Sequence, residues 1–333
     1  MISLDPPAPL DAPQHPGVLA AIRLRERVLG EVRKAVVGQD VALELMLCGI
    51  LAGGHVLLEG VPGVAKTLMA KSLATTLAAE FKRVQFTPDL MPADILGTSI
   101  FDLKTQSFAL VRGPIFTDLL LADEINRAPA KTQSALLEAM QERQVSLEGR
   151  LLPLSNVFTV FATQNPVESE GTYPLPEAQL DRFLLKIEVG YPSPEEEEAI
   201  LQRAHGGFDA SDLGRAGLQA VVSLEELRAA REALTSVVAE PAVISYLRKL
   251  VGGTRVSLRI RLGAGPRAAV HLLMASKALA VLRGRSFVTP DDVRMLASPV
   301  LKHRLLLSPD AELDGATPGD VLREVLDSVE VPR

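Results

Sequence analysis

The sequence predicts an α/β fold in which a parallel sheet is covered by helices on both faces, followed by a smaller helical unit. In the first half, short apolar runs typical of buried strands alternate with segments of helical spacing, which is the pattern of a parallel sheet with crossover helices. After residue 190 the spacing becomes helical almost throughout. The segment Tyr191-Pro192-Ser193-Pro194 separates the two patterns and predicts a boundary.

The elements of the first half can be read in order from these patterns. Helices are expected over 17–35, 40–52, 68–79 and 131–142, where apolar residues recur at helical spacing. Strands are expected at the apolar runs 55–58, 83–86, 116–122, 157–162 and 183–189. Two further segments, 99–111 and 145–152, look like β-hairpins inserted between these elements.

The second half predicts helices only, apart from a weak strand pattern at 256–260. They are expected over 194–205, 223–235, 240–251, 267–283 and 290–303. At the other end of the chain, residues 1–16 contain five prolines and predict a disordered arm. The expected organisation is an arm at 1–16, an αβα core at 17–190, and a linker with a helical domain at 191–333.

Composition and charge narrow the function classes. The 333 residues are 47 % hydrophobic and 23 % charged, an ordinary globular composition, and the formal net charge of −6 gives no global attraction to nucleic acid or an anionic membrane. The most apolar segment, 45–58, is too short to span a bilayer and contains two glycines, so neither a transmembrane segment nor a secretory signal is expected. The single cysteine, Cys48, lies in an apolar helical context and predicts a buried, inert thiol. These features favour a cytoplasmic location.

The segment from Glu59 to Thr67 reads as a turn between a strand and a helix, and it resembles a phosphate-binding loop. The template is G-x-x-x-x-G-K-[ST], and Gly60, Lys66 and Thr67 fit it. Backbone N–H groups of such a turn face a phosphate, the lysine reaches its outer oxygens, and the hydroxyl can ligate Mg²⁺. Ala65 stands where the second glycine belongs, which is tolerable if this residue needs no positive φ. The alternative is an ordinary turn with a surface lysine.

Asp123 and Glu124 follow the apolar run 116–122 and are expected at the same edge of the sheet as the loop. Asp123 can hold Mg²⁺ there, and Glu124 can polarise an attacking water, which is the chemistry of phosphoryl transfer. Adjacent acids at a strand end are common in loops, so the interpretation depends on the phosphate loop that precedes them.

Three further residues are candidates for contact with a triphosphate. Asn165 follows the strand at 157–162 and can orient the water, although Asn-Pro also favours a simple turn. Arg182 precedes a strand and is either a surface ion-pair partner or an arginine finger directed at a neighbouring subunit. Arg267 lies at the start of a helix, where a cation is unfavourable without an anionic partner.

Taken together, these segments resemble the AAA+ ATPases, and specifically the MoxR family, over about residues 20–305. The resemblance depends on four segments: Glu59 to Thr67, Leu121 to Pro129, Ala162 to Pro166 and Gly171 to Phe183, of which the last is the most specific. Ala65 is usual in this family. The one small departure is Gly265, where the family has serine. The implied fold is a P-loop NTPase core followed by a small all-α lid.

The resemblance implies a role for each candidate. Lys66 and Thr67 correspond to Walker A, Asp123 and Glu124 to Walker B, Asn165 to sensor 1, Arg182 to the arginine finger and Arg267 to sensor 2. Thr67 and Asp123 are the implied metal ligands, with ATP or ADP and Mg²⁺ as cofactors. The implied nucleotide-binding residues are Gly38, Gln39, Gly60, Val61, Pro62, Gly63, Val64, Ala65, Lys66, Thr67 and Leu68. The hairpins at 99–111 and 145–152 resemble inserts that commonly face a central pore.

The family resemblance also implies a partner class and leaves alternatives open. Family members are thought to act as chaperones or remodellers in hexameric rings, often beside von Willebrand A domain proteins, so an ATP-hydrolysing homo-oligomer with a protein client is expected. One alternative is a nucleotide-dependent scaffold with little turnover. Another is a nucleic-acid motor, which the sparse basic residues of both inserts disfavour.

Overall fold

The fold is built on a five-stranded sheet whose neighbouring strands are all parallel. The computed structural model describes residues 16–332, except 103, 105 and 167–171, so the predicted arm lies almost wholly outside the described residues. The strand order is β2-β5-β8-β1-β9. The strands are β1 (Val56–Glu59), β2 (Phe81–Gln85), β5 (Leu119–Asp123), β8 (Thr159–Gln164) and β9 (Leu185–Glu188).

Apolar side chains on both faces of these strands explain the continuous apolar runs. In β1, Val56 and Leu58 join one hydrophobic cluster, whereas Leu57 joins another on the opposite face. The first cluster contains helices α1 (Pro16–Val32), α2 (Asp40–Leu51) and α3 (Lys66–Thr76), and the second contains α5 (Ala130–Glu142). Because side chains alternate across a strand, a sheet covered on both sides needs apolar residues at consecutive positions. The predicted fold class is confirmed.

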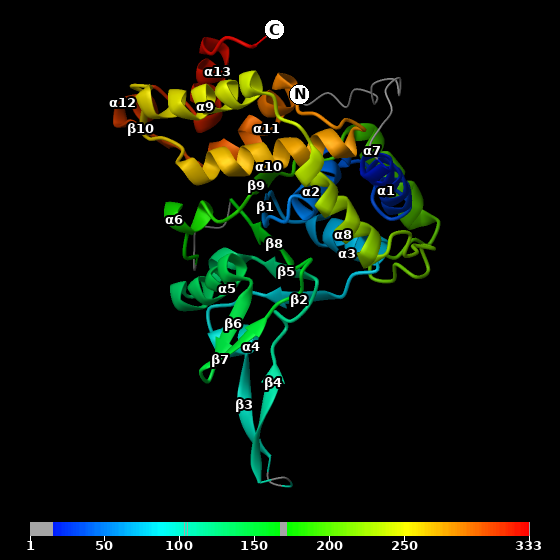
Figure 1. The fold of residues 1–333 in the computed structure, drawn as a ribbon. Helices are drawn as coiled ribbons and strands as arrows, with labels where there is room; N and C mark the ends of the chain where they lie inside the picture. Colours follow the sequence, from blue (N-terminus) through cyan, green and yellow to red (C-terminus); the bar gives the residue numbers. More distant parts are fainter. Residues whose placement is uncertain (1–15, 103, 105, 167–171, 333) are drawn as a thin grey trace.

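Two hairpins extend from the core, as the sequence predicts. They are β3 (Gly97–Asp102) with β4 (Ser107–Arg112), and β6 (Gln144–Leu147) with β7 (Arg150–Pro153). Figure 1 shows the first hairpin reaching away from the body of the molecule. Short helices α4 (Pro92–Leu96) and α6 (Glu177–Leu180) and the 3₁₀ turn η1 (Ile125–Arg127) occupy segments for which the sequence predicts no helix or strand.

The second half is helical and carries one small ribbon. Its larger helices are α7 (Pro194–His205), α8 (Leu224–Ala233), α9 (Pro241–Val256), α10 (Pro266–Leu282) and α11 (Pro290–Leu301). Strands β10 (Ile260–Leu262) and β11 (Leu306–Leu307) pair antiparallel, and α12 (Pro309–Leu313) and α13 (Pro318–Ser328) follow beyond the last expected helix. Among the described residues, no helix is both long and apolar enough to cross a bilayer.

The helical half packs directly on the core through α10. Buried residues of α1, α2, α10 and α11 belong to a single hydrophobic cluster with one face of the sheet. Cys48 of α2 is fully buried and its thiol lies 3.4 Å from the Ala275 carbonyl oxygen of α10. Burial raises the pKa of this thiol, so the predicted buried cysteine is confirmed.

Candidate functional site

The loop between β1 and α3 lies at the carboxyl edge of the sheet. A side chain at Gly60 would collide with the carbonyl oxygen of Val189 on the neighbouring chain segment, so only glycine fits this close approach. Gly63 has φ +87° and Ala65 has φ +64°, both in the left-handed region. From the sequence, alanine is tolerable at this position if the residue needs no positive φ. Ala65 does adopt a positive φ, so this condition is not met. Its strain is about 1 kcal/mol.

Lys66 begins α3 and folds its side chain back over this loop. Its ammonium donates to the Gly60 carbonyl oxygen and lies 3.4 Å from the carbonyl oxygen of Val61. The N-terminus of α3 points into the same space, where backbone N–H groups and the helix dipole favour an anion. A lysine and a helix N-terminus thus converge at one place.

Asp123 ends β5 beside this loop and is almost fully buried. Its carboxylate accepts a hydrogen bond of 2.5 Å from the Thr163 hydroxyl of β8, and the Thr67 hydroxyl lies 3.4 Å from its second oxygen. That second oxygen also receives both Nε and Nη2 of Arg83, at 3.0 and 2.7 Å. Parallel pairing of β2 with β5 places Arg83 here, a contact that the sequence reasoning missed.

Glu124 follows Asp123 in a left-handed backbone conformation and is held by two neighbours. Its Oε2 accepts from Gln85 Nε2 at 2.8 Å and from Arg127 Nη1 at 3.0 Å. Arg83 in turn donates to the Gln85 amide oxygen at 2.9 Å. The carboxylates of Asp123 and Glu124 are therefore linked through the side chains of Arg83 and Gln85.

These residues surround a cavity of about 970 Å³, which we call the loop cavity. Its polar wall contains Lys66, Thr67, Asp123, Glu124 and Asn165, and Asn165 is buried. Lys71, Arg83 and Arg203 also line the cavity. A largely apolar part of the wall comes from the turn after α1, from α7 and from the segment after α7, namely Ala35, Val37, Ile200, Ala204, Phe208 and Ala210. The cavity therefore joins an anion-binding end to an apolar end.

Val37, which precedes the implied nucleotide-binding residues Gly38 and Gln39, contributes to this wall, whereas Gly38 and Gln39 do not. Gly38 and Gln39 have positive φ values of 66° and 60°. The Gln39 amide nitrogen donates to the Gly190 carbonyl oxygen at 3.0 Å and does not line the loop cavity.

The donor set at Thr67 and Asp123 fits Mg²⁺ in part. A hydroxyl and a carboxylate are the hard oxygen ligands that this ion prefers. In the described part of the chain, no three His, Cys, Asp or Glu residues are close enough to hold a metal among themselves. A bound Mg²⁺ here needs further oxygens from phosphate and water, as is usual for this ion.

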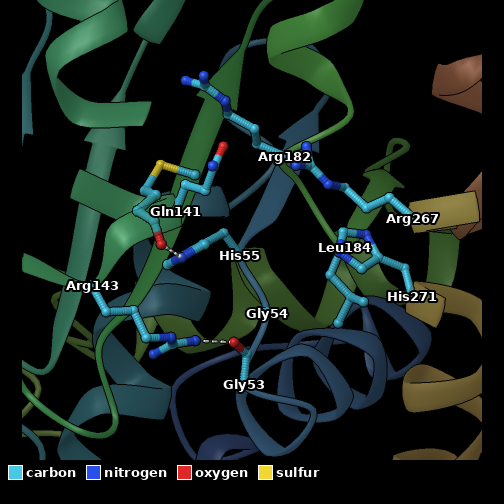
Figure 2. A pocket seen from close by; sticks show the side chains of 10 residues that line it. Gly53, Gly54, His55, Gln141, Arg143, Arg182, Leu184, Arg267 and His271 are labelled. Carbon is cyan, nitrogen blue, oxygen red and sulfur yellow. Dashed lines mark hydrogen bonds between the residues drawn. The ribbon is translucent and has the colours of Figure 1, made fainter. Parts of the chain in front are cut away.

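Arg182 and Arg267 lie together in a second cavity of about 190 Å³, which we call the arginine cavity (Figure 2). It is bordered by Gly53, Gly54 and His55, which precede β1. The loop cavity lies beyond the other end of β1, a strand of four residues that spans about 13 Å. The structure therefore brings the two arginines together and places them at the opposite edge of the sheet from Lys66.

A carboxylate that pairs with two arginines, and a half-buried imidazole, lie at the arginine cavity. Asp181 accepts from Arg267 Nη1 at 3.3 Å and from Arg304 Nε at 2.8 Å. Burial, with a smaller contribution from Arg304, lowers the pKa of His271 to about 4, so this imidazole is neutral at pH 7. The charge of the cavity is therefore carried by guanidinium groups.

Comparisons with known proteins agree with this architecture. Residues 55–185 match the ATPase family associated with various cellular activities (AAA), and residues 252–325 match the AAA lid domain. The chain is 46 % identical to Chaperone MoxR1 of Mycobacterium tuberculosis over 95 % of this chain and 85 % of that protein. It is 32 % identical to Protein MoxR of Methylorubrum extorquens, covering 91 % of this chain and 93 % of that protein.

A solved structure extends the likeness to the whole fold. The crystal structure of an ATPase candidate from Cytophaga hutchinsonii superposes with a TM-score of 0.87 at 40 % identity, covering 95 % of this chain and 97 % of that one. Sequence and structure thus agree over the core and the lid together. The chain belongs to the MoxR family of AAA+ ATPases.

Proposed function

We propose that the protein binds ATP with Mg²⁺ in the loop cavity and hydrolyses it to ADP and phosphate. The observation that carries this proposal is the convergence of Lys66, Thr67, Asp123, Glu124 and Asn165 on one cavity from three separate segments of the chain. The cationic end suits a triphosphate, and the apolar end beside Val37 and Phe208 suits a purine ring.

Each residue then has a role that follows from its position. Lys66 and the N-terminus of α3 stabilise charge on the outer phosphate oxygens. Thr67 and Asp123 hold Mg²⁺, which neutralises phosphate charge when it is bound. Glu124 accepts a proton from the attacking water, and Asn165 orients that water. Arg83 would have to move away from Asp123 Oδ2 for that oxygen to ligate a metal, whereas Gln85 and Arg127 both hold Glu124 through Oε2.

Arg182 and Arg267 are proposed to complete the site of a neighbouring copy. The sheet separates them from the phosphate loop of their own chain, so they cannot reach the same nucleotide as Lys66. A guanidinium delivered by a neighbour is a common source of transition-state stabilisation in phosphoryl transfer. A head-to-tail contact of this kind builds a closed ring when the rotation closes, and we propose a hexamer.

The proposed client is a protein, and the β3–β4 hairpin is the proposed contact. Phe101 and Phe108 form an edge-to-face pair with ring centroids 5.3 Å apart, although both rings are largely exposed. Exposed aromatic pairs on a projecting ribbon are suited to holding apolar segments of another protein. A von Willebrand A domain protein as the partner and a cytoplasmic location remain predictions.

The proposal is tested with Glu124→Gln. This variant keeps the shape of the side chain but removes the base, so ATP binding should persist while phosphate release falls by about 10²- to 10³-fold. Binding is measured with a fluorescent ATP analogue and turnover by phosphate release. Glu142→Gln, an exposed change on α5, is the matched control and should leave both values unchanged. Full turnover in Glu124→Gln contradicts the assignment.

A further inference from the structure

An unusual charge distribution marks the lid. Residues 241–290 contain nine lysines and arginines and no aspartate or glutamate, although the whole chain has a net charge of −6. Four of these cations, Arg259, Arg267, Arg283 and Arg285, pair with acids from other segments. Part of this span, from the end of α9 through β10 to the start of α10, is also rich in exposed apolar side chains. Leu258 is 95 % exposed and Leu262 is 50 % exposed. We call the surface made by Arg255, Leu258, Arg261, Leu262 and Arg267 the basic strip.

The basic strip is continuous with the arginine cavity. Arg255 Nε donates to the Ala264 carbonyl oxygen at 2.7 Å, which holds the end of α9 against the loop that leads into α10. Arg267 follows in the first turn of α10 and lines the arginine cavity beside Arg182. Within the described part of the chain, Arg261 is exposed and makes no ion pair. Cations and leucines therefore border the residues proposed to act on a neighbour.

An acidic surface with matching properties borders the loop cavity. Helix α7 begins with four consecutive glutamates at 195–198, and its inner side contributes Ile200 and Ala204 to the cavity wall. On the outer side, Leu201 is 70 % exposed, one helical turn from Glu197 and Glu198. The rim of the loop cavity thus offers carboxylates around an exposed leucine.

The two surfaces lie on opposite sides of the molecule. In Figure 1, β10 and the neighbouring α12 are at the left, whereas α7 is at the right, beyond α2. Surfaces on opposite sides cannot meet within one copy, but they meet when copies are arranged head to tail. Opposite charges around apolar centres are the complementarity that selects such a contact.

We propose that the basic strip docks on α7 of the neighbouring copy, with Arg261 facing Glu197 and Glu198 and with Leu258 packing against Leu201. This contact orients Arg182 and Arg267 toward the loop cavity of that copy, so the inference rests on the proposed ATPase function and deepens it. Nucleic acid is a less suitable partner for the basic strip than a second copy of the chain. Its phosphate backbone would not bury Leu258 and would not contact the glutamates of α7.

The decisive experiment reverses the charge of Arg261 in the full chain. Assembly is followed by sedimentation velocity across a range of protein concentrations, with ATP and Mg²⁺ at low salt. Arg261→Glu should raise the concentration for half-assembly by about tenfold or more, because like charges then face each other. The difference should shrink at high salt. Leu258→Asp should weaken assembly as well, and since Leu258 is almost fully exposed this change leaves the fold intact.

Reciprocal substitution identifies the partner surface. The variant that combines Arg261→Glu with Glu197→Arg and Glu198→Arg should recover assembly, because it restores opposite charges across the contact. Arg323→Glu, on the exposed side of α13, is the charge-matched control and should assemble as the unmodified protein does.

Several outcomes overturn the inference. The inference is overturned if Arg261→Glu and Leu258→Asp both assemble as the unmodified protein does. It is also overturned if the unmodified chain stays monomeric with nucleotide at every concentration. Loss of single-stranded DNA binding in Arg261→Glu with assembly intact assigns the strip to nucleic acid instead. Failure of the proposed function has a different readout. If Glu124→Gln keeps full turnover while Arg261→Glu weakens assembly, the role of Glu124 is refuted and the docking contact is still supported.

Discussion

Ala65 holds a methyl group at a backbone position that glycine occupies more easily. Its φ of +64° lies in the left-handed region, and the residue stands at the N-cap position immediately before α3. The motif reveals the place of this residue in the turn, but the sign of φ is a property of the folded loop. The conformation was therefore left open by the sequence.

Ala65→Gly should stabilise the protein by about 1 kcal/mol, because glycine adopts this conformation without strain. Ala65→Val should destabilise it, because a β-branched residue at positive φ is more strained than alanine. Urea unfolding measures both changes. Ala229→Gly, in the exposed part of α8, is the matched control and should instead lose about 1 kcal/mol. Equal effects at both sites contradict this explanation.

The burial of His55 should make the free energy of unfolding depend on pH. The imidazole is buried, Nε2 lies 3.1 Å from the Met140 carbonyl oxygen, and Nδ1 accepts from the Val160 N–H at 3.0 Å. Burial, followed by the nearby charge of Arg143, lowers the pKa of His55 to about 3. Below pH 6.5 the unfolded chain binds a proton that the folded chain does not.

The contribution of His55 to stability should therefore be complete above pH 6.5 and fall as the pH drops toward 3, by about 1.4 kcal/mol per pH unit. Unfolding free energies measured in urea between pH 7 and 5 give this slope. His55→Gln keeps a donor and an acceptor without a titrating group, so its slope should be shallower by that amount. A parallel pair of curves for the two proteins would falsify the explanation.

The residues of the loop cavity differ in how far they could be predicted. Lys66, Thr67, Asp123 and Glu124 lie in two short motifs, and a motif keeps its residues together in the fold. Arg83 and Gln85 belong to no motif, and their contacts depend on the parallel register that pairs Gln85 with Asp123. Register is set by tertiary packing, so the sequence alone could not reveal these contacts.

At the scale of elements, length decided what could be predicted. The buried strands and the long helices have enough residues to show a period, whereas α4 and α6 contain five and four residues and show none. Helix α13 is long enough, and its buried Val321, Leu322 and Val325 are spaced as a helix requires. This spacing is visible in the sequence and indicates a helix beyond the last one predicted.

At the scale of elements, replacing Asp292 tests how much its buried ion pair and helix cap stabilise the lid. It is 2 % exposed, completes the N-terminal cap of α11 with Thr289, and accepts from both terminal nitrogens of Arg285. Asp292→Ala should destabilise the protein by about 3–5 kcal/mol, because it leaves a partly buried guanidinium without its carboxylate. Chemical unfolding measures the loss.

The matched control is Asp320→Ala in α13. Asp320 makes the same cap with Thr317, but its side chain is 48 % exposed, so Asp320→Ala should destabilise the protein much less than Asp292→Ala does. A similar small loss at Asp292 would show that burial of the Arg285 pair adds nothing to the stability of the lid.

At the scale of the whole molecule, the two edges of the sheet carry different groups. Lys66 lies at the carboxyl edge and Arg182 at the amino edge, so a single copy cannot use both on one nucleotide. Sequence motifs predict the kind of residue at each place. The distance between the two arginines and the phosphate loop comes only from the folded sheet.

Mixing inactive variants tests this separation. Lys66→Ala and Arg182→Ala should each abolish turnover alone, but an equal mixture should regain about a quarter of the sites, where an intact loop meets an intact arginine. Phosphate release from mixed assemblies measures the recovery. Lys66→Ala mixed with the double variant should show none. Absence of recovery in verified mixed assemblies shows that Arg182 does not act on a neighbour.

The single hydrophobic cluster that joins α1, α2, α10 and α11 has a mechanical consequence. Among the described residues, bending the helical half away from the sheet would separate buried apolar side chains of this cluster, so such bending is costly. If copies assemble as proposed, movement should therefore occur more easily at the contacts between copies than within one copy, and the β3–β4 hairpin should move together with the core from which it projects.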